Sequence, residues 1–120
     1  MNVLIVEDDI FNCEVLTGML DMVIPHMTVH TAKNGREGLK ILDQLSIDII
    51  FCDISMPVMD GTEFIKHVRS KYGQKIPVIC TTAHAVTGDR EKLLLLGFSD
   101  YISKPIDIME IETIIGKYTV

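Results

Sequence analysis

The sequence predicts a single α/β domain, residues 1–120, built on a largely parallel five-stranded β-sheet. Two features lead to this prediction. Short apolar runs bounded by turn residues recur along the chain, as in strands that a parallel sheet buries on both faces. Each run is followed by a segment whose apolar residues recur at helical spacing. Because a helical crossover between parallel strands is right-handed, five such units build one sheet covered by helices.

The first half of the chain shows this alternation. Residues 3–6 form an apolar run, and apolar side chains from Phe11 to Leu20 then follow a helical period. Pro25 closes this helical region, and Asn34 with Gly35 marks a turn. The predicted elements of this half are a strand at 3–6, a helix at 11–20, a strand at 27–31, a helix at 38–45 and a strand at 47–52.

The second half repeats the pattern with shorter elements. Apolar residues from Thr62 onward follow a helical period, and Gly73 and Gly97 stand where helices end. Leu93 to Leu96 is a run of leucines longer than one helical stripe can bury. It belongs either to a packed helix that leaves one or two leucines exposed or to a surface that binds a partner. The predicted elements of this half are a helix at 62–72, a strand at 77–80, a helix at 90–96, a strand at 101–102 and a helix at 108–118.

The composition limits the classes of function that fit this chain. The chain has 17 acidic and 11 basic residues, a net charge of −6, which argues against a direct nucleic-acid surface and favours binding of a cation such as Mg²⁺. Cys13, Cys52 and Cys80 are odd in number and lack metal-ligand spacing, so we expect buried thiols in a reducing cytoplasm. No apolar run approaches the ~20 residues of a membrane span, and residues 1–6 do not resemble a signal peptide. We therefore expect a cytoplasmic protein that does not use a membrane.

Polar side chains follow four of the five predicted strands. They are Glu7, Asp8 and Asp9 after the first strand, Asp53 after the third, Thr82 after the fourth and Lys104 after the fifth. Taken singly, Asp53 is explained as a turn cap, Thr82 as a helix N-cap and Lys104 as a solvated cation. In open α/β sheets, however, ligands gather at the carboxyl ends of the strands, where these residues would converge.

Together these residues resemble the CheY-like receiver domain of bacterial response regulators, which act in two-component and phosphorelay signalling. In that family an acidic pair, a phosphoacceptor Asp, a Thr or Ser and a Lys-Pro occur in this order. The resemblance covers the chain end to end and includes Met56-Pro57, Asp60-Gly61 and the segment 97–105. It implies a flavodoxin-like (βα)5 three-layer sandwich whose five parallel strands have the order 2-1-3-4-5.

The resemblance implies that Asp53 accepts a phosphoryl group. Such a transfer depends on positioning and on cations that neutralise the transferred oxygens. Glu7 and Asp8 would hold Mg²⁺ (or Mn²⁺), directly or through water, together with the Asp53 carboxylate and the main-chain carbonyl of Ser55. An oxygen-only, partly hydrated ligand set suits Mg²⁺. The register of the first strand leaves Asp9 to cap the following helix.

The remaining roles also come from the resemblance. Lys104 would pair with the acceptor carboxylate and then with a phosphoryl oxygen, while the Thr82 hydroxyl would donate to another. Tyr101 matches the family's switch aromatic, although from its position alone it is equally well a half-buried strand tyrosine. Ser55 and His84 would border the path of the attacking water and tune the lifetime of the phosphoryl group.

The implied partners are proteins. A sensor histidine kinase or a histidine phosphotransfer protein would supply the phosphoryl group, which the domain would later lose by autodephosphorylation. A downstream protein or a dimer partner would dock on the face made by the fourth helix, fifth strand and fifth helix. Two settings stay open, a free-standing regulator and a receiver module of a hybrid kinase; Met1 directly before the first strand suits the former.

Two other classes of function compete with this interpretation. An aspartate-nucleophile, Mg²⁺-dependent phosphohydrolase of the haloacid dehalogenase type carries a second Asp two residues after the nucleophile. This chain has Ser55 there and no cap domain, so we expect no enzyme acting on a separate substrate. A degenerate receiver that serves only for docking is disfavoured because the acidic pair, the acceptor, the Thr and the Lys are all present.

Overall fold

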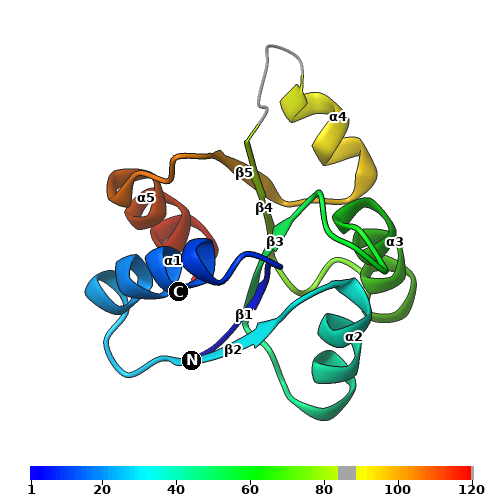
Figure 1. Ribbon diagram of the computed structural model, residues 1–120, viewed down its shortest axis with the longest axis horizontal. Helices are drawn as coiled ribbons and strands as arrows, with labels where there is room; N and C mark the ends of the chain where they lie inside the picture. The colour runs from blue at the N-terminus through cyan, green and yellow to red at the C-terminus, as the bar shows by residue number, and fades with distance from the viewer. Residues whose placement is uncertain (84–88, 120) are drawn as a thin grey trace.

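The computed structural model describes residues 1–83 and 89–119, in which strands and helices alternate along the chain (Figure 1). The strands are β1 (Asn2–Val6), β2 (Thr28–Ala32), β3 (Ile49–Asp53), β4 (Val78–Thr82) and β5 (Asp100–Ser103). The helices are α1 (Ile10–Val23), α2 (Gly35–Gln44), α3 (Gly61–Tyr72), α4 (Asp89–Leu96) and α5 (Ile108–Tyr118). The predicted order of elements is therefore confirmed.

The sheet has the order β2-β1-β3-β4-β5, and every neighbouring pair of strands is parallel. This confirms the predicted flavodoxin-like topology. The chain reverses its direction of travel across the sheet after β2, so the carboxyl ends of β1 and β3 are adjacent. Their register pairs Val6 with Cys52, one residue before Glu7, which follows β1, and Asp53, which ends β3. Ligand sites in such sheets lie at this switch point.

Two apolar cores lie on opposite faces of the sheet. Helices α1 and α5 cover one face, and α2, α3 and α4 cover the other (Figure 1). Every residue of β3 is buried, and its side chains alternate between the cores: Ile50 and Cys52 pack on the α3 side, Ile49 and Phe51 on the α1 side. Burial on both faces explains why this strand is a continuous apolar run.

Side-chain caps set several helix ends. Asp9 accepts a hydrogen bond from the Asn12 N–H at 3.1 Å, which confirms it as the cap of α1. Asn34 caps α2 through the Glu37 N–H, and so this helix begins at Gly35 and not at residue 38 as predicted. Its start was missed because an Asn-Gly pair is a turn signal as well as a cap.

The other differences from the predicted boundaries are small. Strand β3 begins at Ile49 and not at residue 47, and β4 runs on to Thr82. The leucine run divides: Leu93 is buried and Leu96 is half-buried, while Leu94 and Leu95 are exposed. The three cysteines are free; Cys52 and Cys80 are buried as predicted, whereas Cys13 is half-buried. Burial raises the pKa of Cys80 to about 12, which keeps this thiol protonated and unreactive.

Candidate phosphorylation site

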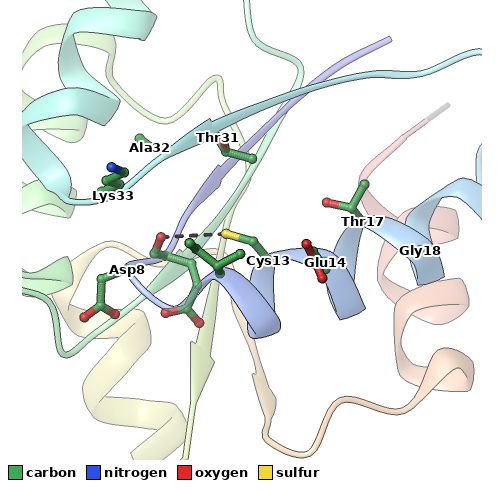
Figure 2. Close-up of a pocket in the computed structure, with 10 residues that line it drawn as sticks. Asp8, Cys13, Glu14, Thr17, Gly18, Thr31, Ala32 and Lys33 are labelled. Atoms are coloured by element: carbon green, nitrogen blue, oxygen red, sulfur yellow. Dashed lines mark hydrogen bonds between the residues drawn. The ribbon is translucent and has the colours of Figure 1, made fainter.

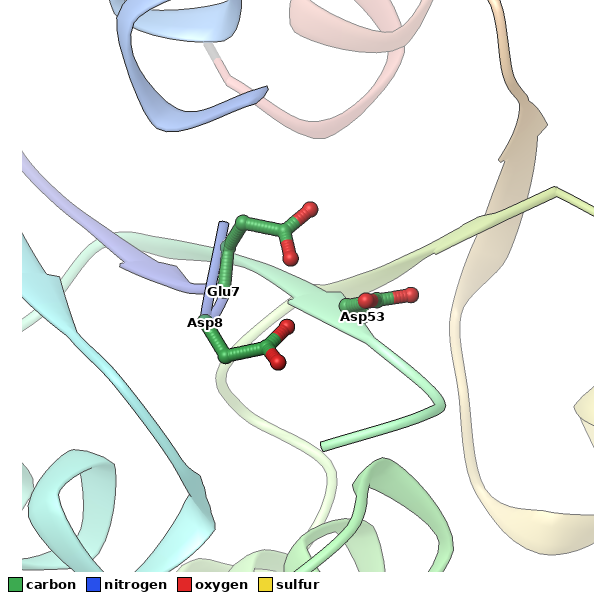
Figure 3. A group of neighbouring side chains, drawn as sticks. All are labelled: Glu7, Asp8 and Asp53. Atoms are coloured by element: carbon green, nitrogen blue, oxygen red, sulfur yellow. The ribbon is translucent and has the colours of Figure 1, made fainter. Parts of the chain in front are cut away.

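Three carboxylates meet at the carboxyl edge of the sheet. Glu7 and Asp8 follow β1 and Asp53 ends β3, and one oxygen of each lies within 4.8 Å of the others. Figure 3 shows the Glu7 and Asp8 side chains extending from the end of β1 toward the side on which Asp53 lies. Glu7 and Asp53 are buried, while Asp8 is exposed. Three anions held this close repel one another, so the arrangement favours a cation between them.

The main chain around Asp53 is tightly fixed. Its Oδ1 accepts a hydrogen bond from the Ile54 N–H at 2.8 Å, and the Ile54 carbonyl accepts one from the Gly61 N–H at 2.8 Å. A Cβ at position 61 would lie 2.3 Å from the Asp53 carbonyl oxygen, so only glycine permits this approach. Asp60 then caps α3 by accepting from the Glu63 N–H. The Asp-Gly pair thereby holds the loop that carries Asp53.

Lys104 follows directly after β5 and joins the acidic cluster. Its N–H donates to the Thr82 carbonyl at 2.7 Å, which places its side chain beside the end of β4. Nζ lies 2.7 Å from Glu7 Oε1 and 3.5 Å from Asp53 Oδ2. Lys104 thus makes its shorter contact with an acid of the β1 loop and its longer one with the expected acceptor.

The electrostatics of the cluster follow from this geometry. Burial lowers the pKa of Lys104, but the hydrogen bond from Lys104 to Glu7 and the charge of Asp53 outweigh burial and raise it. Partial desolvation and the adjacent Glu7 carboxylate raise the pKa of Asp8. The lysine is therefore held as a cation, and a neutralising ion beside Asp8 would favour the charged form of its carboxyl.

A cavity of about 410 Å³ adjoins the cluster on the β4 side. Asp53, Ser55, Thr82 and Lys104 line one part of it, and residues of α4, Lys92 among them, line another. Thr82 is buried at the end of β4. The space beside the Asp53 carboxylate is large enough for a phosphoryl group and extends as far as α4.

The predicted site residues occupy three kinds of position. Glu7, Asp8, Asp53 and Lys104 meet directly, and Ser55 and Thr82 line the adjoining cavity. Tyr101 is half-buried on β5 and packs against the core on the α4 side. His84 lies outside the described residues.

Sequence reasoning missed Lys92. It lies on α4 and lines the cavity beside Asp53. The sequence places it next to the leucine run but gives no sign of which face of the helix it occupies.

Among residues 1–83 and 89–119, no helix is long and apolar enough to cross a membrane.

Comparison with known proteins places these observations in a family. The family model described as response regulator receiver domain matches residues 3–116. The signal transduction histidine-protein kinase BarA of Escherichia coli (strain K12) is 34% identical over 119 residues. The match covers 98% of this chain and 13% of the kinase, so the chain spans a small part of that relative.

Two solved structures are similar over nearly the whole chain. The receiver domain of the sensor histidine kinase PA1611 from Pseudomonas aeruginosa PAO1, with a magnesium ion coordinated in its active site cleft, has a TM-score of 0.85 and 30% identity, covering 98% of this chain and 95% of that one. The co-crystal structure of the Saccharomyces cerevisiae histidine phosphotransfer protein Ypd1 and the receiver domain of its response regulator Ssk1 gives a TM-score of 0.88 and 29% identity, covering 98% and 88%.

Proposed function

The chain belongs to the response regulator receiver domain family of two-component and phosphorelay signalling, and on this premise we propose that Asp53 is its phosphoacceptor. The phosphoryl donor is a phosphohistidine of a sensor histidine kinase or of a histidine phosphotransfer protein. One observation carries the proposal: Asp53 ends a buried strand with Glu7, Asp8 and Lys104 gathered around its carboxylate. The free cysteines fit a reducing cytoplasm as the place of action.

The transfer itself is a displacement at phosphorus. An oxygen of the Asp53 carboxylate forms the new O–P bond while the N–P bond of the phosphohistidine breaks. The electron pair of that bond returns to the ring nitrogen, which takes up a proton from solvent. Lys104 Nζ, 3.5 Å from Asp53 Oδ2, neutralises charge on a phosphoryl oxygen, and the Thr82 hydroxyl donates to another. Hydrolysis of the acyl phosphate by water later returns the domain to its starting state.

The donor set fits a hard divalent cation. Three carboxylates within 4.8 Å of one another offer only oxygen, which Mg²⁺ or Mn²⁺ prefers. Glu7, Asp8 and Asp53 would hold the ion together with the main-chain carbonyl of Ser55. When bound, the ion supplies positive charge to the phosphoryl oxygens. Two further side chains control hydrolysis. Ser55 lies two residues after Asp53, and His84 lies two residues after Thr82. Both set how readily water reaches the phosphoryl group.

The response to phosphorylation runs through β4 and β5. Thr82 moves toward the phosphoryl oxygens, and Tyr101 turns into the space that this movement leaves. The face made by α4, β5 and α5 changes with them. It carries exposed apolar side chains, with Leu95 88% and Met109 70% exposed, and there a downstream protein or a second copy binds.

Labelling with a small donor tests the acceptor. Incubation with acetyl phosphate and Mg²⁺ should add one phosphoryl group to the chain, detected by intact mass, and peptide mapping should place it on Asp53. Asp53→Asn should abolish the addition, whereas Asp21→Asn, an exposed control on α1, should not. Labelling of the Asp53→Asn chain at the wild-type rate would refute the assignment. Turnover of p-nitrophenyl phosphate would instead favour the phosphohydrolase.

A further inference from the structure

We propose that Lys92 of α4 is the second cation of the phosphoryl site, and that it draws the amino-terminal half of α4 toward Asp53 when the phosphoryl group is present. Lys104 then shares the phosphoryl oxygens with a second lysine. Helix α4 responds to phosphorylation directly as well as through Thr82 and Tyr101. This inference rests on the proposed function, because it assigns a further residue to the same site.

One face of α4 is turned toward the cavity beside Asp53. Four residues at the spacing of a single helical face line this cavity: Asp89, Lys92, Leu93 and Leu96. Leu93 is buried and Leu96 is half-buried, so these two leucines fix the rotation of the helix about its axis. Lys92 lies on the same face and is exposed, which places it where the cavity meets water.

Phosphorylation adds charge that the known cations of the site do not balance. The three carboxylates of the cluster are matched by Lys104 and by the one divalent ion that they would hold. A phosphoryl group brings about 1.5 to 2 negative charges at pH 7, in place of the single charge of the Asp53 carboxylate. Lys104 is already shared with Glu7, 2.7 Å from its Nζ. Among the described residues that line the cavity, Lys92 is the remaining cation.

Helix α4 is fixed at one end and lightly packed at the other. Beyond its carboxyl end, Arg69 of α3 donates from Nε to the Gly97 carbonyl at 2.7 Å and from Nη2 to Ser99 Oγ at 3.2 Å. At the other end, none of the side chains of residues 89–92 is buried. Attraction to a phosphoryl group can therefore shift the amino-terminal half of the helix while the carboxyl end stays in place.

Asp89 brings an opposing charge to the same cavity. It is half-buried and lies one turn before Lys92 on the same face of α4. An acid and a lysine three residues apart on a helix attract each other. The phosphoryl group competes with this single carboxylate for Lys92 and carries the larger charge, so the lysine moves toward Asp53 when the group is bound.

Beryllofluoride, a mimic of the phosphoryl group, tests the contact without group transfer. With Mg²⁺ held constant, Lys92→Met should weaken its binding about threefold to fivefold, the scale expected for an exposed charge pair. Lys92→Arg should bind it nearly as wild type does. Arg90→Met is the matched control, since Arg90 is exposed on the same helix and does not line the cavity. The melting temperature without beryllofluoride should be the same in all these chains.

Labelling by acetyl phosphate gives a second arm. Lys92→Met should slow the phosphorylation of Asp53, because the cavity attracts the anionic donor less strongly, and Asp89→Asn should accelerate it. Added salt should shrink both differences, since Lys92 is exposed and its field is screened. Intact-mass kinetics at low and high salt measure these rates.

Amide exchange tests the movement of α4. Saturating beryllofluoride should change the exchange of residues 89–96 in the wild-type chain and in Arg90→Met. In Lys92→Met it should still change exchange around Asp53 and in β5, but residues 89–96 should exchange as they do in the unbound chain.

Each outcome decides a separate question. Wild-type affinity for beryllofluoride in Lys92→Met would overturn the role of Lys92 in binding the phosphoryl group. An equal loss in Arg90→Met would overturn it too, because any positive charge on α4 would then suffice. Exchange changes at 89–96 that persist in Lys92→Met would show that α4 moves without this lysine. Failure of acetyl phosphate to label Asp53 in the wild-type chain would overturn the proposed function instead.

Discussion

Two lysine and carboxylate pairs of this chain have the same chemistry and differ in burial. Lys104 and Glu7, at the carboxyl edge of the sheet, have side chains 18% and 6% exposed. Lys71 and Asp43, which join α3 to α2, are 60% and 49% exposed. Water screens the outer pair, so it contributes little to stability. The inner pair holds its charges in a less polar place, where the loss of one charge leaves the other uncompensated. On the proposed function, this is also where the phosphoryl group would be bound.

The largest effect should come from removing the inner lysine. Lys104→Met leaves Glu7 and Asp53 close together without their cation, which should lower the free energy of unfolding by about 3 kcal/mol. Phosphorylation of Asp53 by acetyl phosphate should slow by about 10²- to 10³-fold, the usual cost of losing a charge-stabilising donor. Urea denaturation and intact-mass kinetics measure the two effects. Lys71→Met is the matched control, and equal losses in both variants would erase the distinction between the pairs.

A smaller loss should follow from moving the main chain that carries the inner cluster. Gly61→Ala places a Cβ against the Asp53 carbonyl, and the required shift should cost about 1–3 kcal/mol and slow phosphorylation. Gly116→Ala on α5 meets nothing within 4 Å and should instead raise stability by about 0.5–1 kcal/mol. Denaturation midpoints distinguish the two. A Gly61→Ala chain as stable and active as wild type would mean that the Asp53 loop is not fixed by this contact.

The contrast between these pairs also shows which contacts of the site can be predicted from the sequence. Asp53, Glu7 and Lys104 were predicted to converge because each follows a strand, and parallel strands bring their carboxyl ends to one edge. That Lys104 lies closer to Glu7 than to Asp53 was not predictable, since the choice among neighbouring carboxylates depends on side-chain rotamers. A groove of about 490 Å³ between α1 and the end of β2 (Figure 2) escaped prediction because it depends on empty space over Gly18.

Metal should stabilise the inner cluster and leave the outer pair unaffected. Binding at Glu7, Asp8 and Asp53 stabilises the folded chain by mass action, about 2.7 kcal/mol at a hundredfold excess over Kd, and also relieves repulsion among the three acids. Mg²⁺ should therefore raise the melting temperature at neutral pH. Asp8→Ala should remove the shift and Asp43→Ala should retain it. A shift that survives Asp8→Ala would place the ion elsewhere.

The smallest effect should be the pH dependence of the outer pair. The hydrogen bonds that Asp43 accepts from Lys71 and Tyr72 lower the pKa of its carboxyl, and the hydrogen bond to Asp43 raises the pKa of Lys71. A lowered carboxyl pKa contributes stability above the ordinary Asp value and loses it as the pH falls through the lowered one. A raised lysine pKa contributes below the ordinary Lys value and loses it as the pH rises through the raised one.

The pair is therefore intact across the neutral range, and its small contribution should disappear at both extremes. Titration of the Asp43 carboxyl by NMR should show a pKa below the ordinary range in wild type and a return toward it in Lys71→Met. Because both side chains are half in water, added salt should weaken the shift. If the pKa of Asp43 changed neither with added salt nor in Lys71→Met, the hydrogen bond from Tyr72 alone would be responsible for lowering it.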